Sequence, residues 1–169
     1  MPRLIVVCGL PGTGKTTLAR ALASALGGVY LRVDAVETPL FRAGIDVGPL
    51  GYEIVSELAR SNLALGSEVV VDLVNPIPIT RRMWPDLAGS AGATLAVFEC
   101  HVPDEGEHRR RVEERAPDLE GQVVPTWDEV AGREYAAWDE VRDGTRHLID
   151  MTDTEAGIRN ALAAIGRCP

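Results

Sequence analysis

The sequence predicts an α/β fold in which a mainly parallel sheet is sandwiched between helices. Short apolar and β-branched runs alternate along the chain with segments that carry apolar residues at helical spacing. This alternation favours parallel strand pairing, because a crossover helix lets the next strand run in the same direction as the last. The 169 residues are the usual length of one domain, so we expect a single domain over residues 1–169.

Five strands and four helices account for most of the chain. The expected strands are the apolar runs Leu4–Cys8, Val29–Val33, Val69–Leu73, Thr94–Cys100 and His147–Ile149. Helical spacing places the helices at Thr16–Leu26, Tyr52–Leu65, Ile79–Ala88 and Thr154–Ile165. Glycines follow the first two helices, as is common at helix ends, and Pro85 acts as a local breaker in the third.

The region from residue 104 to residue 138 differs in composition from the rest of the chain. It is strongly charged and includes the stretch EHRRRVEERAPDLEGQVVPTW, which offers few side chains to bury. Such a segment gains little free energy from packing against a core. We therefore expect residues 104–138 to form a mobile lid on the surface of the domain.

The net charge indicates which kinds of partner to expect, and the cysteines indicate the cellular location. A formal net charge of −8 provides no general attraction to nucleic-acid phosphates or to anionic lipid. We therefore expect neither nucleic acid nor a membrane as partner, and no protein partner is evident. Cys8, Cys100 and Cys168 are an odd number, and the apolar run Leu4–Cys8 is too short for a signal peptide. Reduced thiols and a cytoplasmic location are expected.

A glycine-rich turn follows the first expected strand. Gly9, Gly14, Lys15 and Thr16 match G-x-x-x-x-G-K-[ST], in the strand-to-helix context that this phosphate-binding loop requires. Backbone N–H groups attract phosphate, Lys15 adds a positive charge, and the Thr16 hydroxyl can ligate magnesium. The alternative is a glycine-rich turn whose lysine is merely solvated. The expected nucleotide-binding residues are Gly9, Leu10, Pro11, Gly12, Thr13, Gly14, Lys15, Thr16 and Thr17.

The expected nucleotide is ATP, with Mg²⁺ as the accompanying ion. GTPases of this class carry an N-K-x-D motif that reads guanine, and no asparagine here begins that pattern. ATPase motors usually need a longer chain to carry their coupling elements. The missing guanine motif and the short chain therefore favour a small kinase.

Polar residues follow two of the expected strands, at the sheet edge where ligands of open α/β sheets gather. Asp34 is expected to accept a proton from a substrate hydroxyl, and a helix N-cap is the alternative. Asp72 is expected to form a magnesium site with Thr16; orienting the substrate or capping a helix are its alternatives. Asn75 either contacts the substrate or shapes the turn.

Four arginines lie among glutamates at the start of the expected lid. Arg111 and Arg115 are four positions apart in an expected helix, so they share a face. We expect this pair to close over the β- and γ-phosphates of the nucleotide. Arg109 and Arg110 are expected to pair with glutamates in solvent.

Other polar and aromatic residues carry less specific patterns. Arg42, in LFRAG, is either a contact to the acceptor or a surface arginine. His101 and His108 do not combine with the cysteines at a spacing typical of zinc ligands, so no zinc is assigned. Three tryptophans are expected to pack rather than to stack on a base: Trp84, Trp127 and Trp138.

The order of these motifs resembles a known group of small P-loop kinases. The group contains the kinase domain of phage polynucleotide kinase, chloramphenicol phosphotransferase, zeta toxins and many AAA-type ATP-binding proteins. The resemblance covers nearly all of the chain. It rests on GLPGTGKTT, LRVDAVE, VVVDLVNPIPITRRMW, EHRRRVEER and PTWDEVAGREY.

The resemblance implies a P-loop NTPase fold of the nucleoside-kinase type, with a five-stranded parallel sheet ordered 2-3-1-4-5, helices on both faces and an arginine-rich lid. It also implies that ATP lies on the loop and the acceptor near the second strand. Asp34 resembles the general base, and Arg115 the lid arginine on the γ-phosphate, with Arg111 beside it. Glu37 stands where polynucleotide kinases have an arginine, which argues against a nucleic-acid 5′ end as acceptor.

The expected function is an ATP-dependent phosphotransferase that moves the γ-phosphate to a hydroxyl of a small molecule, such as a nucleoside-like metabolite, an antibiotic or a sugar nucleotide. The expected catalytic residues are Asp34, Lys15 and Arg115. The expected substrate-binding residues are Asp34, Arg42, Asp72 and Asn75. Two alternatives remain: a kinase of 5′-hydroxyl nucleic-acid ends, which needs a basic channel, and an ATP-sensing module with slow hydrolysis, which needs an exposed partner surface.

Overall fold

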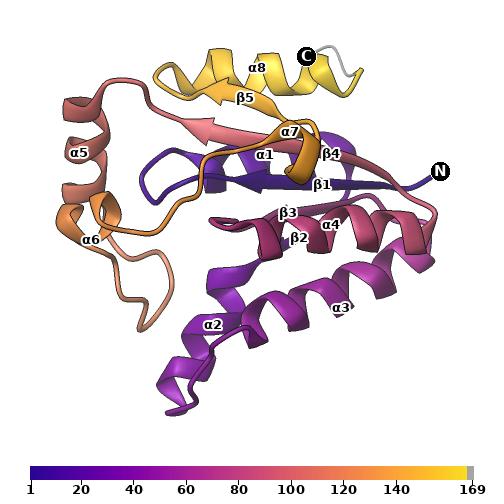
Figure 1. Cartoon of the computed structure of the whole chain (residues 1–169), viewed down its shortest axis with the longest axis horizontal. Coiled ribbons are helices and arrows are strands. Elements are labelled where there is room, and N and C mark those ends of the chain that lie inside the picture. The colour runs from indigo at the N-terminus through magenta and orange to yellow at the C-terminus, as the bar shows by residue number, and fades with distance from the viewer. Residues whose placement is uncertain (167–169) are drawn as a thin grey trace.

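The computed structural model describes residues 1–166 and has a five-stranded parallel sheet at its centre (Figure 1). The strand order is β2-β3-β1-β4-β5, which confirms the expected sheet. The strands are β1 (Arg3–Cys8), β2 (Val29–Arg32), β3 (Val69–Asp72), β4 (Thr94–His101) and β5 (His147–Asp150). The helices are α1 (Lys15–Leu26), α2 (Val33–Arg42), α3 (Leu50–Ala64), α4 (Pro78–Ala91), α5 (Glu105–Glu113), α6 (Trp127–Ala131), α7 (Glu140–Asp143) and α8 (Thr154–Ala164).

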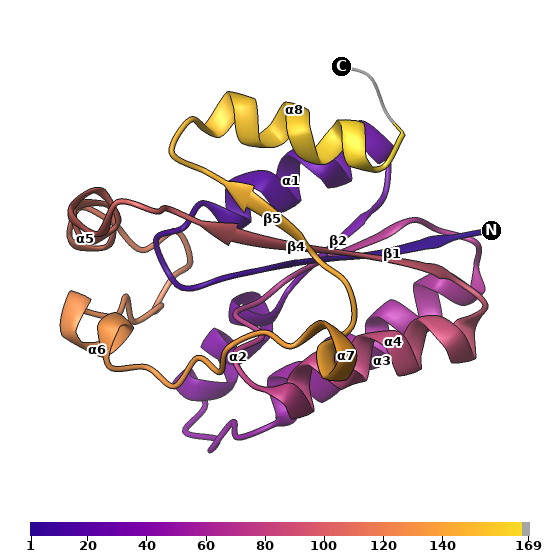
Figure 2. The same cartoon turned by 45° about the horizontal axis from the view of Figure 1, so that its top comes forward.

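The sheet is covered on both faces because alternate residues of its strands point to opposite sides. In β1, Ile5 and Val7 pack against α1 and α8, whereas Leu4, Val6 and Cys8 pack against α3 and α4. Figure 2 shows these two helical layers with the sheet between them. A sheet buried on both faces explains why its strands are continuous apolar runs.

Helix α1 shows how the local sequence fixes the boundaries of an element. Gly14 precedes it with φ of 86°, and Gly27 ends it with φ of 61°, in the left-handed region that favours glycine. The amides of Gly27 and Gly28 bond to carbonyls of the last turn at 3.2 and 2.9 Å. These glycines end the helix where the sequence predicted.

Helix α4 is longer than expected, and the prediction that Pro85 breaks it is wrong. The helix runs from Pro78 to Ala91 with Pro85 inside it. Pro78 occupies the first turn, where its fixed φ suits a helix start. Trp84 and Leu87 are almost fully buried on either side of Pro85, so their packing outweighs the lost backbone hydrogen bond. Trp84 lies in the core as predicted.

Three helices were not predicted. Helix α2 begins directly after β2, so Val33 is its first residue rather than the last residue of the strand. Helices α6 and α7 have five and four residues, too few for a periodic pattern to show.

The arginine-rich helix is also shorter than the sequence suggested. Helix α5 ends at Glu113 with Glu114 as its C-cap, so Arg115 lies beyond the helix and the expected shared face with Arg111 is wrong. Helices α5 and α6 both lie beyond the carboxyl ends of the central strands (Figures 1 and 2).

Two further features concern redox state and membranes. Cys8 and Cys100 are free and buried, and burial raises the pKa of the Cys8 thiol to about 12. Cys168 lies outside the described residues. From residue 1 to residue 166, none of the helices is both long and apolar enough to span a bilayer.

Candidate active site at the carboxyl edge of the sheet

The glycine-rich turn between β1 and α1 is shaped by close packing as well as by backbone conformation. Gly9 and Gly12 have φ of 138° and 83°, values that other residues rarely adopt. A Cβ on Gly9 would overlap the carbonyl oxygen of Cys100, and one on Gly12 would lie 2.6 Å from Val112 Cγ2. The turn therefore runs tightly between β4 and α5, with its amides and the start of α1 at the same place.

Helix α5 is fixed to this turn and to the loop after β5. His108 Nε2 donates a hydrogen bond of 2.8 Å to the carbonyl of Pro11. The guanidinium of Arg111 donates to the carbonyls of Met151 and Thr152, both at 2.9 Å. Arg111 thus joins α5 to the loop after β5 in this structure, and its contact to phosphate stays a prediction.

The oxygen atoms expected to hold magnesium lie next to each other. Thr16 Oγ1 donates to Asp72 Oδ2 at 2.7 Å, and the hydroxyl of Tyr30 donates to the same oxygen at 2.8 Å. Asp72 is 1% exposed. A hydroxyl and a carboxylate fit Mg²⁺, which prefers oxygen ligands and keeps several waters, so one or two protein ligands suffice. Within residues 1–166, no group of three or more His, Cys, Asp or Glu side chains could hold a metal ion.

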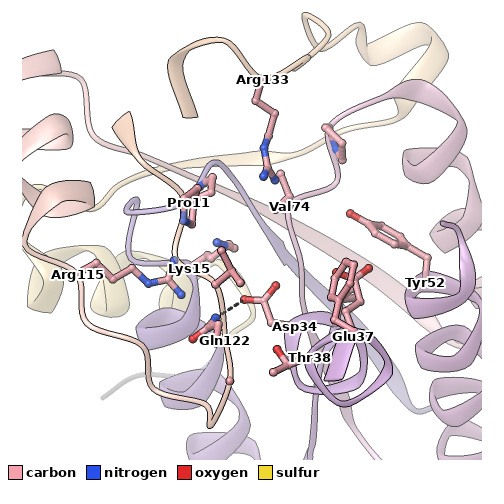
Figure 3. A pocket seen from close by; sticks show the side chains of 16 residues that line it. Pro11, Lys15, Asp34, Glu37, Thr38, Tyr52, Val74, Arg115, Gln122 and Arg133 are labelled. Atoms are coloured by element: carbon pink, nitrogen blue, oxygen red, sulfur yellow. Dashed lines mark hydrogen bonds between the residues drawn. The ribbon is translucent and has the colours of Figure 1, made fainter. Parts of the chain in front are cut away.

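A cavity of about 640 Å³ opens beside the turn. Its walls come from the turn, from α2, from the start of α3, from the loop after β3 and from the segment between α5 and α6. Figure 3 shows Lys15, Asp34 and Arg115 around this space. A smaller hollow of about 260 Å³ follows the phosphate-loop side and shares Lys15 and Arg115 with the cavity.

Lys15 is the first residue of α1, and it lines this cavity. It is 5% exposed, and burial lowers the pKa of its ammonium, while the charges of Asp72 and Asp34 act in the opposite direction. Arg115, a cation that also lines the cavity, lowers this pKa further. Two cations held side by side repel each other, so an anion placed between them gains from both.

Asp34 lies in the first turn of α2 and faces the same cavity. It is not the N-cap of the helix, which is Arg32. Its Oδ2 accepts hydrogen bonds from Arg32 at 3.1 Å and from Gln122 at 3.3 Å. All hydrogen bonds of this carboxylate to the part of the chain that the structure describes use Oδ2. The other oxygen, Oδ1, therefore remains available to a ligand hydroxyl (Figure 3).

The same arginine joins α2 to the expected lid. Arg32 is 4% exposed, and its two terminal nitrogens bond to the carboxylate of Asp118 at 2.7 and 3.0 Å. Arg42 donates to the carbonyl and side chain of Glu120, both at 3.4 Å. Residues 118–122 are thereby held against α2.

The structure brings only some of the predicted site residues to the cavity. Lys15, Asp34 and Arg115 line it, together with Pro11 of the turn. Among the described residues that form its walls, Arg42, Asp72 and Asn75 do not occur. Asp72 accepts a hydrogen bond from Thr16, and Arg42 contacts Glu120. Asn75 is 1% exposed, and its backbone N–H donates to the Tyr52 hydroxyl at 3.1 Å. The substrate contacts predicted for these three residues stay predictions.

Several cavity residues were not given a role from the sequence. Their spacing in the sequence gives no sign that they lie together, so only the fold joins them. The group includes Glu37, Thr38, Tyr52, Gln122 and Arg133. Arg133 lies in PTWDEVAGREY, which contributed to the resemblance, but nothing in its spacing indicated that it would face Asp34.

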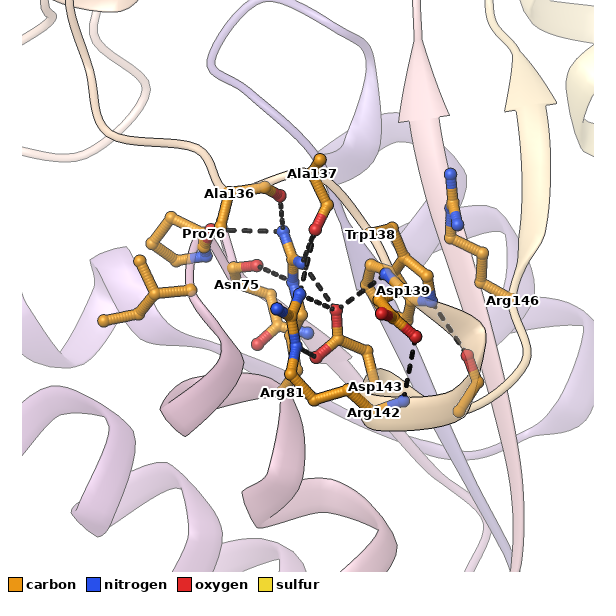
Figure 4. A network of polar contacts seen from close by, with 12 residues as sticks. Asn75, Pro76, Arg81, Ala136, Ala137, Trp138, Asp139, Arg142, Asp143 and Arg146 are labelled. Atoms are coloured by element: carbon orange, nitrogen blue, oxygen red, sulfur yellow. Dashed lines mark hydrogen bonds and ion pairs between the residues drawn. The ribbon is translucent and has the colours of Figure 1, made fainter.

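A buried polar network around Arg81 shares Pro76 with the cavity wall (Figure 4). Arg81 of α4 is 1% exposed and forms an ion pair of 2.9 Å with Asp143. Its remaining donors bond to the carbonyls of Asn75, Pro76, Ala136 and Ala137. The guanidinium lies 4.6 Å from the ring centre of Trp138. Arg81 therefore holds the turn after β3 to the segment that follows α6.

The fold and the phosphate-loop geometry define a P-loop α/β protein. A family model described as an AAA domain matches residues 4–129, which is most of the chain, so the chain belongs to this AAA domain family. An uncharacterized protein of Mycobacterium tuberculosis (strain H37Rv) is 30% identical in an alignment of 113 residues that covers 58% of this chain and 23% of that protein. The chain thus matches about a quarter of the length of that curated relative.

Solved structures share the fold over nearly the full length. A sugar kinase from Janibacter is similar with a TM-score of 0.73 and 18% identity, over 100% of this chain and 97% of the other. A gluconokinase from Sinorhizobium meliloti is similar with a TM-score of 0.66 and 24% identity, over 98% and 92%. At these identities the similarity establishes the fold alone.

Proposed function

We propose that this chain is a magnesium-dependent phosphotransferase that moves the γ-phosphoryl group of ATP to a hydroxyl of a small molecule. One observation carries the proposal: Lys15, Asp34 and Arg115 line a single cavity that begins at the glycine-rich turn. Two cations at the phosphate side and a carboxylate on α2 are the groups that phosphoryl transfer requires.

The nucleotide would lie with its β- and γ-phosphates on the amides of the turn and at the start of α1. Lys15, at the start of α1, and Arg115, in the lid segment, would both contact these phosphates. Thr16 and Asp72 would hold Mg²⁺, which balances the charge of the phosphates when it is bound. The loop from Asp150 to Thr154, to which Arg111 bonds, is the proposed place of the adenine.

Transfer begins when an acceptor hydroxyl lies against Asp34 Oδ1. The carboxylate accepts the hydroxyl proton as the oxygen attacks the γ-phosphorus. The bond from this phosphorus to the β,γ-bridging oxygen breaks, and ADP leaves with the bonding electrons. Lys15 and Arg115 stabilise the charge that develops on the transferred group. Arg32 and Gln122 hold the other carboxylate oxygen and so orient the base.

Residues 104–138 are proposed to act as the lid of this reaction. Their contacts to the end of β2 and the start of α2, between Asp118 and Arg32 and between Gln122 and Asp34, are polar. Closing the lid over bound substrates would exclude water, which otherwise competes as an acceptor.

The size of the cavity and the net charge of the chain support a small acceptor. A volume of about 640 Å³ is in the range of small-molecule sites. The net charge of −8 does not favour a nucleic acid. The fold shared with proteins named as a sugar kinase and a gluconokinase points in the same direction.

The proposal is tested by measuring ADP release from Mg²⁺-ATP in the presence of pooled acceptors. The pools contain sugars and sugar acids, nucleosides, aminoglycosides, and a 5′-hydroxyl oligonucleotide. We expect one small-molecule pool to raise turnover far above the rate without acceptor, and Lys15→Ala to abolish this stimulation. Phosphate transfer to the oligonucleotide alone, or ATP binding that no pool converts into turnover, would contradict the proposed function.

A further inference from the structure

We propose that Glu37 and Arg133 select the acceptor, and that the acceptor is a polyhydroxylated molecule carrying a carboxylate or a phosphate group. The inference rests on the proposed function, because it assigns the second substrate of the same reaction. It follows from the distribution of charge and of unsatisfied polar groups around the cavity (Figure 3).

Glu37 extends the acidic wall that Asp34 begins. The two residues are three positions apart in α2, so they are neighbours on one face of the helix. Glu37 lies against the first turn of α3, where a Cβ on Gly51 would lie 2.5 Å from Glu37 Cγ. Glycine at position 51 therefore gives the carboxyl group its place at the cavity wall.

The carboxyl group of Glu37 has no hydrogen-bond partner among residues 1–166. Burial, with a contribution from the charge of Asp34, raises its pKa to about 7. Near neutral pH it is therefore present in both forms, and it can accept or donate a hydrogen bond. A half-buried carboxyl group without a partner costs free energy that a ligand hydroxyl can recover.

Two neighbouring carboxyl groups match two neighbouring hydroxyls. The Cβ atoms of helix residues three apart are about 5–6 Å from each other, which is within reach of adjacent carbons of a polyol. The reaction places one hydroxyl at Asp34. A second hydroxyl then lies at Glu37, which predicts an acceptor with more than one hydroxyl group.

Arg133 supplies the opposite charge. It follows α6, and Figure 3 shows its side chain directed into the cavity, across from Glu37 and Tyr52. Its guanidinium makes no hydrogen bond or ion pair within the described chain. Lys15 and Arg115 stand at the phosphate turn, so Arg133 is the cation left for the acceptor. Its planar fork of donors suits a carboxylate or a phosphate, and it repels acceptors that carry several ammonium groups.

The test compares acceptors that differ only in the anionic group. D-gluconate is paired with sorbitol, and glucose 6-phosphate with glucose, so that one arm reports a carboxylate and the other a phosphate. We expect kcat/KM for the preferred anionic member to exceed that of its neutral partner by about 100-fold, the scale of a bidentate charge-assisted contact.

Three variants assign this preference to residues. Arg133→Met is expected to remove the preference for the anionic acceptor, with less than about 3-fold change for the neutral one. Glu37→Ala is expected to raise KM for both members by about 10-fold, the scale of one hydrogen bond to a charged group. Arg82→Met, an exposed arginine of α4 outside the cavity, is the matched control and should change neither.

Failure of this inference is distinguishable from failure of the proposed function. If neutral polyols or aminoglycosides are phosphorylated as efficiently as the anionic acceptors, or if Arg133→Met keeps the preference, the acceptor class is wrong while the kinase stands. Calorimetric titration of the four probes onto the ADP-bound protein gives a second readout. Equal binding of charged and neutral probes overturns the inference even without turnover.

Discussion

The buried network around Arg81 and the cavity beside Lys15 both contain arginines, but these side chains are held in opposite ways. Arg81 donates to four backbone carbonyls and to Asp143, and both members of this ion pair have fully buried side chains. Arg115 and Arg133 line the cavity, and their guanidinium groups make no hydrogen bond or ion pair with the other described residues. In the network every donor of the Arg81 guanidinium is paired, whereas in the cavity the guanidinium donors of Arg115 and Arg133 are available to a ligand.

This difference separates structural arginines from those available to a ligand. A buried guanidinium with every donor paired stabilises the chain segments that it joins, and removing it leaves its partners unsatisfied. A guanidinium in a cavity without partners contributes little to folding and becomes useful when an anion enters. The comparison predicts that substitutions in the two regions have separable effects on stability and on transfer.

The largest loss of stability is expected for Arg81→Met. The change removes the hydrogen bonds that Arg81 donates to Asp143 and to four carbonyls, and leaves Asp143 with Arg142 and the Asp139 amide as its donors. Breaking such a buried pair costs about 3–5 kcal/mol. For a chain of this length we expect Tm to fall by about 10 °C. Denaturant unfolding of the variant and of Arg81→Lys measures the effect. A loss below about 1 kcal/mol would remove the distinction between the two regions.

Arg115→Ala should have the opposite profile. Removing a cation from the transferred phosphoryl group lowers kcat by about 10²- to 10³-fold, whereas the free energy of unfolding should stay within about 0.5 kcal/mol. Steady-state kinetics and thermal unfolding on the same preparation measure both quantities.

Arg109→Ala is the matched control for Arg115→Ala. Arg109 lies six positions earlier, is exposed and pairs with Glu113 at 2.8 Å. We expect its substitution to change neither the transfer rate nor the stability measurably, because exposed pairs contribute about 0.2–1 kcal/mol. An equal loss of rate in both variants would show that Arg115 acts through general charge rather than through its place in the cavity.

The last prediction concerns the pH dependence of stability. The pKa of Glu37 is raised from 4.5 to about 7 in the folded chain, so between these values the folded state binds more protons than the unfolded state. This carboxyl group therefore lowers the free energy of unfolding as pH rises from 4.5 to 7. In Glu37→Gln that decrease is absent, so the difference in Tm between variant and wild type should grow with pH in this window and level off above it. A difference that is constant from pH 4.5 to pH 8 would contradict the raised pKa.

The sheet and the phosphate loop could be predicted because local sequence decides them. The strands are buried on both faces and therefore form continuous apolar runs, and the loop depends on glycines at fixed spacing. Sheet order came only with the resemblance, since no strand shows which strand it pairs with. Helix α2 was missed because Asp34, Glu37 and Thr38 face the cavity and break its apolar pattern.

Residues of the candidate site could be predicted only where they belong to a known motif or directly follow an expected strand. Lys15 and Asp34 satisfy this condition, and both line the cavity. Arg111 and Arg115 were treated as a pair because of their spacing, but α5 ends between them, and their side chains take different directions. Glu37 and Arg133 are 96 positions apart in the sequence and meet across the cavity only through the tertiary fold.

The most direct test of the central account is phosphoryl transfer by Asp34→Asn, measured together with its affinity for Mg²⁺-ATP. Asparagine keeps the size of the side chain but cannot accept the acceptor proton. We predict that transfer falls by about 10²- to 10⁴-fold, while the Kd for Mg²⁺-ATP stays within about 3-fold, a shift of less than 1 kcal/mol. Transfer at the wild-type rate, or loss of ATP binding, would contradict the assignment of Asp34 as the base of the reaction.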